Sequence, residues 1–141
     1  MRFIIIVKAT PASEAEAGPA DRVDEALMAA MASYHEALAE AGVLLDAAGL
    51  QPSAKGWRIR YAGGRRSTLD GPFTETKELI AGYTLIQVRS RDEAIEWARR
   101  FPAPHGALAD AEIEVRPLYE PDDFGPSTAT DRLRDLLPAK T

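Results

Sequence analysis

Two histidines, His35 and His105, are the side chains of this sequence best suited to acid–base chemistry. An imidazole has an unperturbed pKa of about 6.5, so it can exchange a proton near neutral pH. His35 lies within a helical apolar pattern and is the predicted general base. His105 lies in a predicted loop, where we expect it to bind a ligand. The alternative for His35 is a structural histidine at a helix edge, half packed and half solvated.

A polar segment that begins at Asp70 is the second candidate region. Asp70 is the predicted catalytic partner, because its carboxylate could orient an imidazole or bind a substrate hydroxyl. Four side chains that follow are predicted to bind a ligand: Thr74, Glu75, Thr76 and Lys77. Lys77 would neutralise an acidic substrate. The alternative is ordinary turn chemistry, in which Asp70 bonds to the backbone of its own turn.

Tyr34 and Tyr83 complete the predicted ligand-binding residues, because either hydroxyl could line a pocket. Their alternative role is as core or interface aromatics, and Trp57 and Trp97 are interpreted as packing residues. The sequence has no phosphate loop, nucleotide fingerprint or nucleophile elbow, since Gly63-Gly64 lacks the required spacing and the following helix.

Composition limits the classes of site and partner. The 141 residues fit one domain, which we place over residues 1–120, followed by a C-terminal tail over 121–141. The chain has no cysteine and only two histidines, so we expect neither a metal nor a cofactor. Its net charge is -5, with basic residues dispersed among acids, which argues against nucleic acid as a partner.

The N-terminal apolar run, Phe3 to Val7, is only five residues long and ends at Lys8. It is too short for the core of a signal peptide or for a membrane span. We therefore expect a cytoplasmic protein without a membrane partner. The run is β-branched and does not alternate, which predicts a strand covered on both faces.

The apolar pattern also predicts the elements that position the candidate residues. Strands are predicted over residues 3–7, 43–50, 57–61, 66–69, 82–89 and 112–118. A mobile connection over 10–20 leads to a helix over about 22–41, with Asp21 as its cap and Gly42 at its left-handed end. A second helix opens at the capping box Ser90–Glu93.

This order predicts an α+β fold with a ferredoxin-like protomer, in which both helices cover one face of a mostly antiparallel sheet. The other face would expose apolar side chains such as Tyr83 and Leu85. Because soluble monomers rarely expose so large an apolar patch, we expect a homodimer in which a second sheet covers it, a dimeric α+β barrel. The alternative is that the tail or the 51–69 segment folds over this face.

The motifs of this chain resemble the YCII-related family, and within it the DGPF subgroup. The resemblance rests on Asp70-Gly71-Pro72-Phe73 with the following Thr74 to Glu78, and on Gly82-Tyr83 at the start of a strand. It covers about residues 1–120. It implies a ferredoxin-like protomer, a dimeric barrel and a cleft whose biochemical role is mostly unestablished.

The same resemblance implies a His–Asp pair, with the histidine on the first helix and the aspartate just after the second. This chain departs from that pattern at both positions. His35 lies one turn after the matching position, near Met31, and residues 100–102 contain no acid. The acid–base chemistry proposed for the family therefore does not transfer directly to this chain.

Two functions are compatible with these patterns. The first is a small-molecule protein that binds an acidic or aromatic metabolite between the first helix, the sheet and the 70–78 segment. If it is catalytic, we expect lyase-like or isomerase-like proton transfer, with His35 as base and Asp70 as its orienting partner. The alternative is a non-catalytic regulatory module linked to transcription, since the resemblance implies an association with sigma factors. Convergence of His35 and Asp70 on one closed pocket would favour chemistry, and an open apolar surface would favour a protein partner.

Overall fold

The computed structural model describes residues 1–15 and 24–137. A four-stranded antiparallel sheet has the strand order β2-β5-β1-β6, and a separate two-stranded hairpin pairs β3 with β4. The strands are β1 Arg2–Lys8, β2 Leu44–Gly49, β3 Trp57–Ala62, β4 Arg65–Asp70, β5 Ile80–Gln87 and β6 Ile113–Pro117. This strand order is the ferredoxin-like one, and it confirms the predicted α+β fold class.

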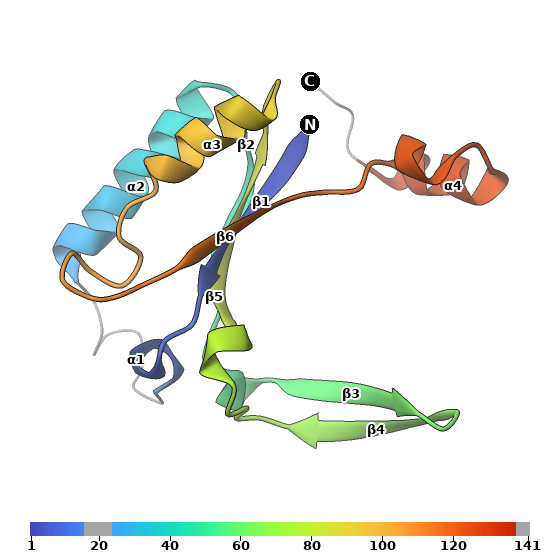
Figure 1. The fold of residues 1–141 in the computed structure, drawn as a ribbon, viewed down its shortest axis with the longest axis horizontal. Helices are drawn as coiled ribbons and strands as arrows, with labels where there is room; N and C mark the ends of the chain where they lie inside the picture. The colour runs from blue at the N-terminus through green and yellow to red at the C-terminus, as the bar shows by residue number, and fades with distance from the viewer. Residues whose placement is uncertain (16–23, 138–141) are drawn as a thin grey trace.

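The helices among the described residues are α1 Pro11–Glu14, α2 Glu25–Glu40, α3 Arg91–Arg99 and α4 Thr128–Leu136. Figure 1 shows α2 and α3 together on one side of the sheet. The hairpin and α4 extend from opposite ends of the sheet, on the side away from these two helices. No helix within the described ranges combines the length and the apolar character needed to cross a membrane.

Helix α2 begins later than its sequence pattern predicts. Asp24 is its cap, and the Asp24 carboxylate accepts hydrogen bonds from the backbone N–H groups of Ala26 and Leu27, at 3.0 and 3.2 Å. The predicted cap, Asp21, lies outside the described residues. Gly42 ends the helix with a φ of 74°, the left-handed conformation that was predicted there.

The predicted connection over residues 10–20 contains a short helix, α1, in its described part. Thr10 and Ser13 cap this helix reciprocally, because each side chain accepts a hydrogen bond from the other residue's backbone N–H. The Glu14 carboxylate then accepts from both the backbone N–H and the hydroxyl of Ser53. These contacts tie α1 to the segment that leads into the hairpin. Residues 16–20 of the predicted connection lie outside the described residues.

The core lies between the sheet and the two helices above it. Alternate residues of β1 and β5 point toward the helices and are buried, as the predicted alternation of β5 requires: Phe3, Ile5, Thr84 and Ile86. Tyr34 and Leu38 of α2 pack onto them. The intervening side chains, which include Ile4 and Leu85, are only half-buried, because no element within residues 1–15 and 24–137 covers the second face.

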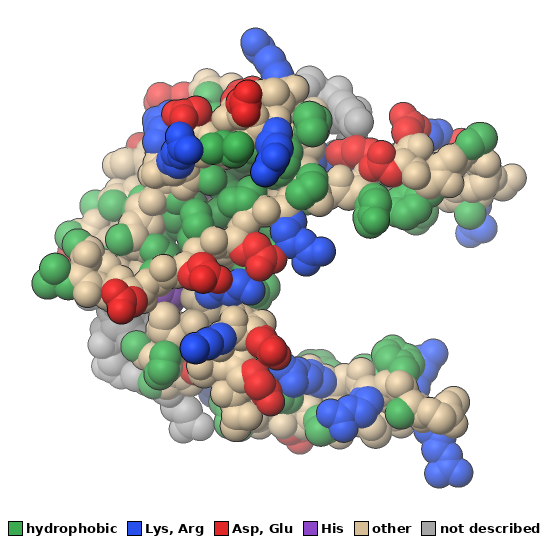
Figure 2. Space-filling view, viewed as in Figure 1, with side chains coloured by type: hydrophobic (Ala, Val, Ile, Leu, Met, Phe, Trp, Pro, Cys, Tyr) green, Lys and Arg blue, Asp and Glu red, His purple; other side chains and the backbone are tan. Residues whose placement is uncertain are grey.

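The hairpin projects beyond the sheet, so its residues Trp57 to Thr68 are all exposed. Trp57 was expected to be a packing residue, but 65% of its surface is exposed. Strand β3 was expected to have one exposed face, and both of its faces are exposed. Neither the hairpin nor α4 lies on the second face of the sheet, and Figure 2 shows a hollow between the two projections.

Candidate functional site

A pocket of about 470 Å³ lies between α2, strands β2 and β5, and the loop that follows α3. We call it the His35 pocket. Most of its lining is apolar, and five of the described side chains that line it carry a polar group: Ser13, His35, Tyr83, Thr84 and His105. The described lining contains no Lys, Arg, Asp or Glu. Among the described lining residues, the side chains that can carry a charge near neutral pH are therefore the two imidazoles.

His35 uses both of its ring nitrogens within the protein. Its Nδ1 lies 2.7 Å from the backbone carbonyl oxygen of Met31, one turn earlier on α2. A carbonyl oxygen can only accept, so Nδ1 carries a hydrogen and donates it. In the neutral ring, Nε2 then has a lone pair, which accepts the hydroxyl proton of Thr84 at an N–O distance of 2.8 Å. The backbone thereby sets the tautomer of His35.

Thr84 is the side chain through which a bound molecule would exchange a proton with Nε2 of His35. It lies on the central strand β5, lines the His35 pocket and is only 2% exposed. Its hydroxyl can pass its own proton to Nε2 of His35 while it takes a proton from a bound molecule. The pair is therefore arranged for a proton relay, in which Met31 holds the imidazole in the required tautomer.

Aromatic rings hold the His35 side chain in place. The ring of Tyr34 meets it edge to face at a centroid distance of 5.4 Å, and Phe101 does so at 6.3 Å. Tyr34 itself belongs to the core, and its hydroxyl donates to the carbonyl oxygen of Trp97 at 2.7 Å. Burial raises the pKa of Tyr34 to about 12. Tyr34 is not among the described residues that line the pocket, so it has the core position that was weighed as its alternative.

His105 is the second imidazole on the pocket. Its Nε2 lies 2.9 Å from the backbone carbonyl oxygen of Lys8, so Nε2 carries the hydrogen and donates it. Within residues 1–15 and 24–137, no hydrogen bond occupies Nδ1 of His105. His105 therefore has a fixed tautomer and an uncommitted ring nitrogen, a combination that suits a base or a hydrogen-bond acceptor for a ligand.

Tyr83 also lines the pocket, but its hydroxyl is engaged elsewhere. It donates to the carboxylate of Asp46 at 2.8 Å, and this bond raises the pKa of Tyr83. Tyr83 alternates with Thr84 along β5, so its side chain leaves the strand on the face opposite the helices. Its hydroxyl is therefore committed to Asp46 and directed away from the helices.

The Asp70 segment does not join the His35 pocket. Asp70 is the last residue of β4, pairs with Trp57 across the hairpin and is exposed. It is absent from the described lining of the pocket, and so are the other predicted ligand-binding residues of this segment: Thr74, Glu75, Thr76 and Lys77. The structure thus brings His35, Tyr83 and His105 to one pocket and places Asp70 at the base of the hairpin.

The turn after Asp70 holds the hairpin to the rest of the protein. Gly71 donates its backbone N–H to Gly56 at 3.0 Å, and Phe73 donates its own to the hydroxyl of Ser53 at 3.0 Å. A side chain at Gly71 would overlap the carbonyl group of Ser53. The guanidinium of Arg58 stacks 3.8 Å above the centre of the Phe73 ring. These contacts give Gly71 and Phe73 a structural role.

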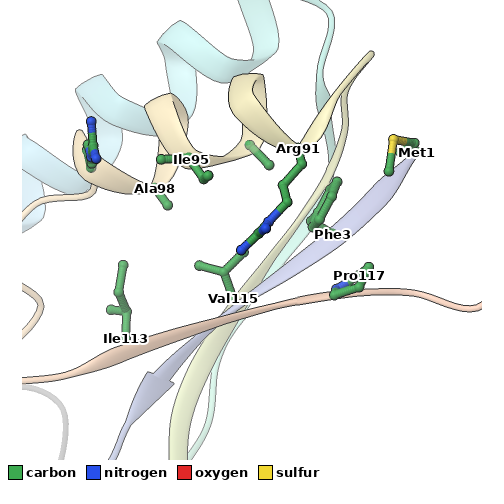
Figure 3. A pocket seen from close by; sticks show the side chains of 10 residues that line it. Met1, Phe3, Arg91, Ile95, Ala98, Ile113, Val115 and Pro117 are labelled. Carbon is green, nitrogen blue, oxygen red and sulfur yellow. The ribbon is translucent and has the colours of Figure 1, made fainter.

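A second pocket of about 530 Å³ lies under α3, against β1 and β6, and is shown in Figure 3. Its floor is apolar, and the side chain of Arg91 extends from α3 across it toward Val115. Arg91 and Arg99 are the charged side chains among its described lining, which contains no imidazole, carboxylate or hydroxyl. This α3 pocket can accept an anion with an apolar body, but it offers no group for acid–base chemistry.

Sequence reasoning missed Thr84 and the α3 pocket. The signal for Thr84 was available, because the alternation of β5 places it on the same face as Ile86 and Val88. The α3 pocket had no comparable signal, since it arises from the space that the short α3 leaves above the edge strand β6. No cluster of His, Asp or Glu that could hold a metal occurs within the described ranges.

Two comparisons place this chain among known proteins. The family of YCII-related domains matches residues 1–118. An uncharacterized protein from Rhizobium meliloti (strain 1021) is 33% identical over 101 residues, which cover 72% of this chain and 82% of that protein. The similarity therefore spans the whole sheet, α2, α3 and the hairpin.

Proposed function

The chain belongs to the YCII-related family, and we propose that it is a cytoplasmic homodimer that binds a small aromatic or weakly acidic metabolite in the His35 pocket. The observation that supports this most strongly is the presence of two imidazoles, His35 and His105, on one largely apolar pocket. A backbone carbonyl sets the tautomer of each ring. Pockets with apolar walls and a few fixed polar groups are typical small-molecule sites.

The lining of the pocket narrows the chemical class of the ligand. Its apolar walls favour a flat, carbon-rich body, and its volume of about 470 Å³ is within the usual range for small molecules. Because the described lining has no Lys or Arg, a strongly charged acid would be poorly compensated there. A phenol, an enol or a monocarboxylate on a ring fits these constraints best.

If the protein is an enzyme, the proposed chemistry is proton transfer on such a ligand. His35 would accept a proton through the Thr84 hydroxyl, and His105 would bind or deprotonate a second group. The carbonyl of Met31 then takes the orienting role that was expected of Asp70. The catalytic role of Asp70 and the ligand-binding role of residues 74–77 stay predictions, and this proposal does not use them.

A thermal-shift screen against phenols, enols and aromatic monocarboxylates tests this proposal. A ligand at about 100 times its dissociation constant adds about 2.7 kcal/mol of stability, a shift of several degrees for a domain of this size. We expect a hit to be lost in His35→Gln and in His105→Gln and kept in Arg91→Gln, which alters only the α3 pocket. A hit that is lost only in Arg91→Gln would contradict the proposal.

The half-buried second face of the sheet supports the homodimer. Ile4, Ile6 and Leu85 lie there and are only half-buried by the part of the chain that the structure describes. Burying such a face against a second copy is the usual solution for an apolar sheet surface. Sedimentation equilibrium should give a dimer for the native chain and a monomer for Ile6→Glu, which places an uncompensated charge on this face.

The open second face also favours a second function, a non-catalytic regulatory module that binds a transcription protein. The exposed apolar residues of the hairpin, Trp57, Ile59 and Tyr61, are the specific observation behind it. A thermal-shift screen in which no ligand stabilises the intact dimer would favour this function over the small-molecule proposal.

A further inference from the structure

The β3–β4 hairpin carries an apolar stripe that the described residues of its own chain leave exposed. Trp57, Ile59 and Tyr61 alternate along β3, so they share one face, and their exposed fractions are 65%, 50% and 68%. An isolated two-stranded hairpin is marginally stable in water unless another layer packs on it. The stripe therefore indicates a contact surface for another chain.

The hairpin is also strongly basic in an acidic protein. Between Trp57 and Asp70 it holds four arginines and one aspartate, a formal charge of +3, whereas the whole chain has -5. Arg66 stacks on the ring of Tyr61 within the hairpin, and Arg58 stacks on the ring of Phe73, which follows it. None of the four arginines has a carboxylate partner among the described residues. The hairpin is thus an unpaired basic surface.

The C-terminal arm, which we define as Pro121–Leu137, has the opposite charge. Four aspartates and two arginines give it a formal charge of -2. Its helix α4 exposes apolar side chains at Leu133 and Leu136, which are 53% and 80% exposed. Figure 2 shows hydrophobic side chains on the sides of both projections that face the hollow. The arm therefore offers exposed apolar side chains that can pack on the stripe of the hairpin, together with a net negative charge opposite in sign to that of the hairpin.

The positions of the two projections limit how two copies can meet. Figure 1 shows them at opposite ends of the open sheet face, both extending away from α2 and α3. Two such faces can pack together around either of two two-fold axes. One axis places hairpin on hairpin and arm on arm. The other places each hairpin on the partner's arm. The first choice sets +3 against +3, whereas the second sets +3 against -2. Like charges in contact are repulsive, so electrostatics selects the second.

We propose that the two copies clasp each other twice, with the hairpin of each packed on the C-terminal arm of the other. This inference rests on the proposed homodimer and specifies its two-fold axis. The occupant of the stripe is then a second copy of this chain, and the hairpin arginines meet the aspartates of the arm. Each clasp occurs twice because the interface is symmetric.

Cysteine crosslinking tests the clasp cleanly because the chain has no cysteine of its own. Ile59→Cys marks the hairpin and Leu133→Cys marks α4, both at exposed positions. With a short bismaleimide, each variant alone should give no crosslinked dimer, and the two co-expressed should give a 59–133 link identified by mass spectrometry. A 59–59 link, or a dimer that forms no link, would overturn the clasp and leave the homodimer standing. A monomer in sedimentation equilibrium would overturn both.

Charge reversal gives an independent measurement. Arg60→Glu with Arg65→Glu should raise the dimer dissociation constant by about tenfold or more at low salt, with a smaller effect at high salt. Adding Asp135→Arg should restore part of the affinity. The matched control reverses Arg91 and Arg99 to Glu on α3, on the other side of the sheet. Equal weakening by the control, or binding of a DNA duplex that is lost only in the hairpin variant, would contradict the clasp.

Discussion

Nε2 of His35 lies 2.8 Å from the hydroxyl oxygen of Thr84, a hydrogen bond that joins α2 to the central strand of the sheet. It is formed between a half-buried imidazole and a hydroxyl that is almost fully buried. A polar bond at the edge of an apolar core stabilises the packing and fixes the relative positions of the two groups. The contact therefore has a structural consequence and, in the proposed function, a chemical one, which different measurements can separate.

The structural consequence predicts the effect of Thr84→Val. Valine keeps the shape of the side chain but removes the hydroxyl, which leaves Nε2 of His35 without this partner. We expect the free energy of unfolding, measured with urea, to fall by about 1–2 kcal/mol. Thr68→Val on the exposed strand β4 is the matched control and should change it by less than about 0.5 kcal/mol. Equal effects at both positions would mean that the hydrogen bond between His35 and Thr84 adds nothing to the free energy of unfolding.

The sequence indicated the secondary structure of this site more reliably than its assembly. The alternation of β5 and the helical pattern around His35 come from local periodicity, and both are present as predicted. The distance between His35 and Asp70 depends on where the hairpin points, which no local pattern encodes. The alternation of Trp57, Ile59 and Tyr61 looked like that of a half-buried strand. The same alternation occurs in a strand whose two faces are both exposed, so the pattern could not distinguish the two cases.

The first residue of α2 is a second feature that local sequence patterns could not determine. Both Asp21 and Asp24 are residues that cap helices well, and the apolar stripe does not distinguish them. The hydrogen bonds to Ala26 and Leu27 identify Asp24 as the cap. Asp24→Ala should lower the free energy of unfolding by about 1 kcal/mol, whereas Asp24→Asn should keep most of it. Thermal denaturation of the two variants checks this. Equal stability of Asp24→Ala and Asp24→Asn would mean that the Asp24 side chain does not cap the helix.

The raised pKa of Tyr34 predicts how the free energy of unfolding depends on pH in the alkaline range. Burial raises the pKa of its phenol from 10.0 to about 12, so the folded protein keeps a proton that the unfolded chain loses above pH 10. This contribution to stability is fully present below pH 10 and is lost as the pH rises toward 12. The loss is on the order of 2 kcal/mol. Urea unfolding between pH 9 and 11 should therefore show a steeper fall for the native chain than for Tyr34→Phe.

The control for this prediction is Tyr61→Phe, because Tyr61 is exposed on the hairpin. It should leave the alkaline slope unchanged. Tyr34→Phe should also be less stable than the native chain at neutral pH by about 1 kcal/mol, since it loses the hydrogen bond to Trp97. Parallel pH profiles for native chain and Tyr34→Phe would show that the phenol ionises normally in the folded state.

The close approach of Gly71 to the backbone of Ser53 predicts that this contact holds the hairpin to the domain. A Cβ at this position would overlap the carbonyl oxygen of Ser53 and lie 2.7 Å from its carbonyl carbon, so the backbone of one segment must move. At Gly56, in the adjacent segment, a Cβ would make only an ordinary contact of 3.7 Å with the same oxygen. Gly71→Ala should therefore loosen the base of the hairpin, and Gly56→Ala should not.

Limited trypsin digestion reads this out directly, because the hairpin arginines are exposed and become cleavable when the strands separate. We expect Gly71→Ala to be cut within residues 58–66 at least about tenfold faster than the native chain, a change of about 1.4 kcal/mol in local opening. Gly56→Ala should be cut at the native rate. Because the hairpin forms a sheet of its own, separate from the four-stranded sheet, far-UV circular dichroism should show that α2 and α3 persist in both variants. Loss of the whole fold in Gly71→Ala would instead make this turn part of the folding core.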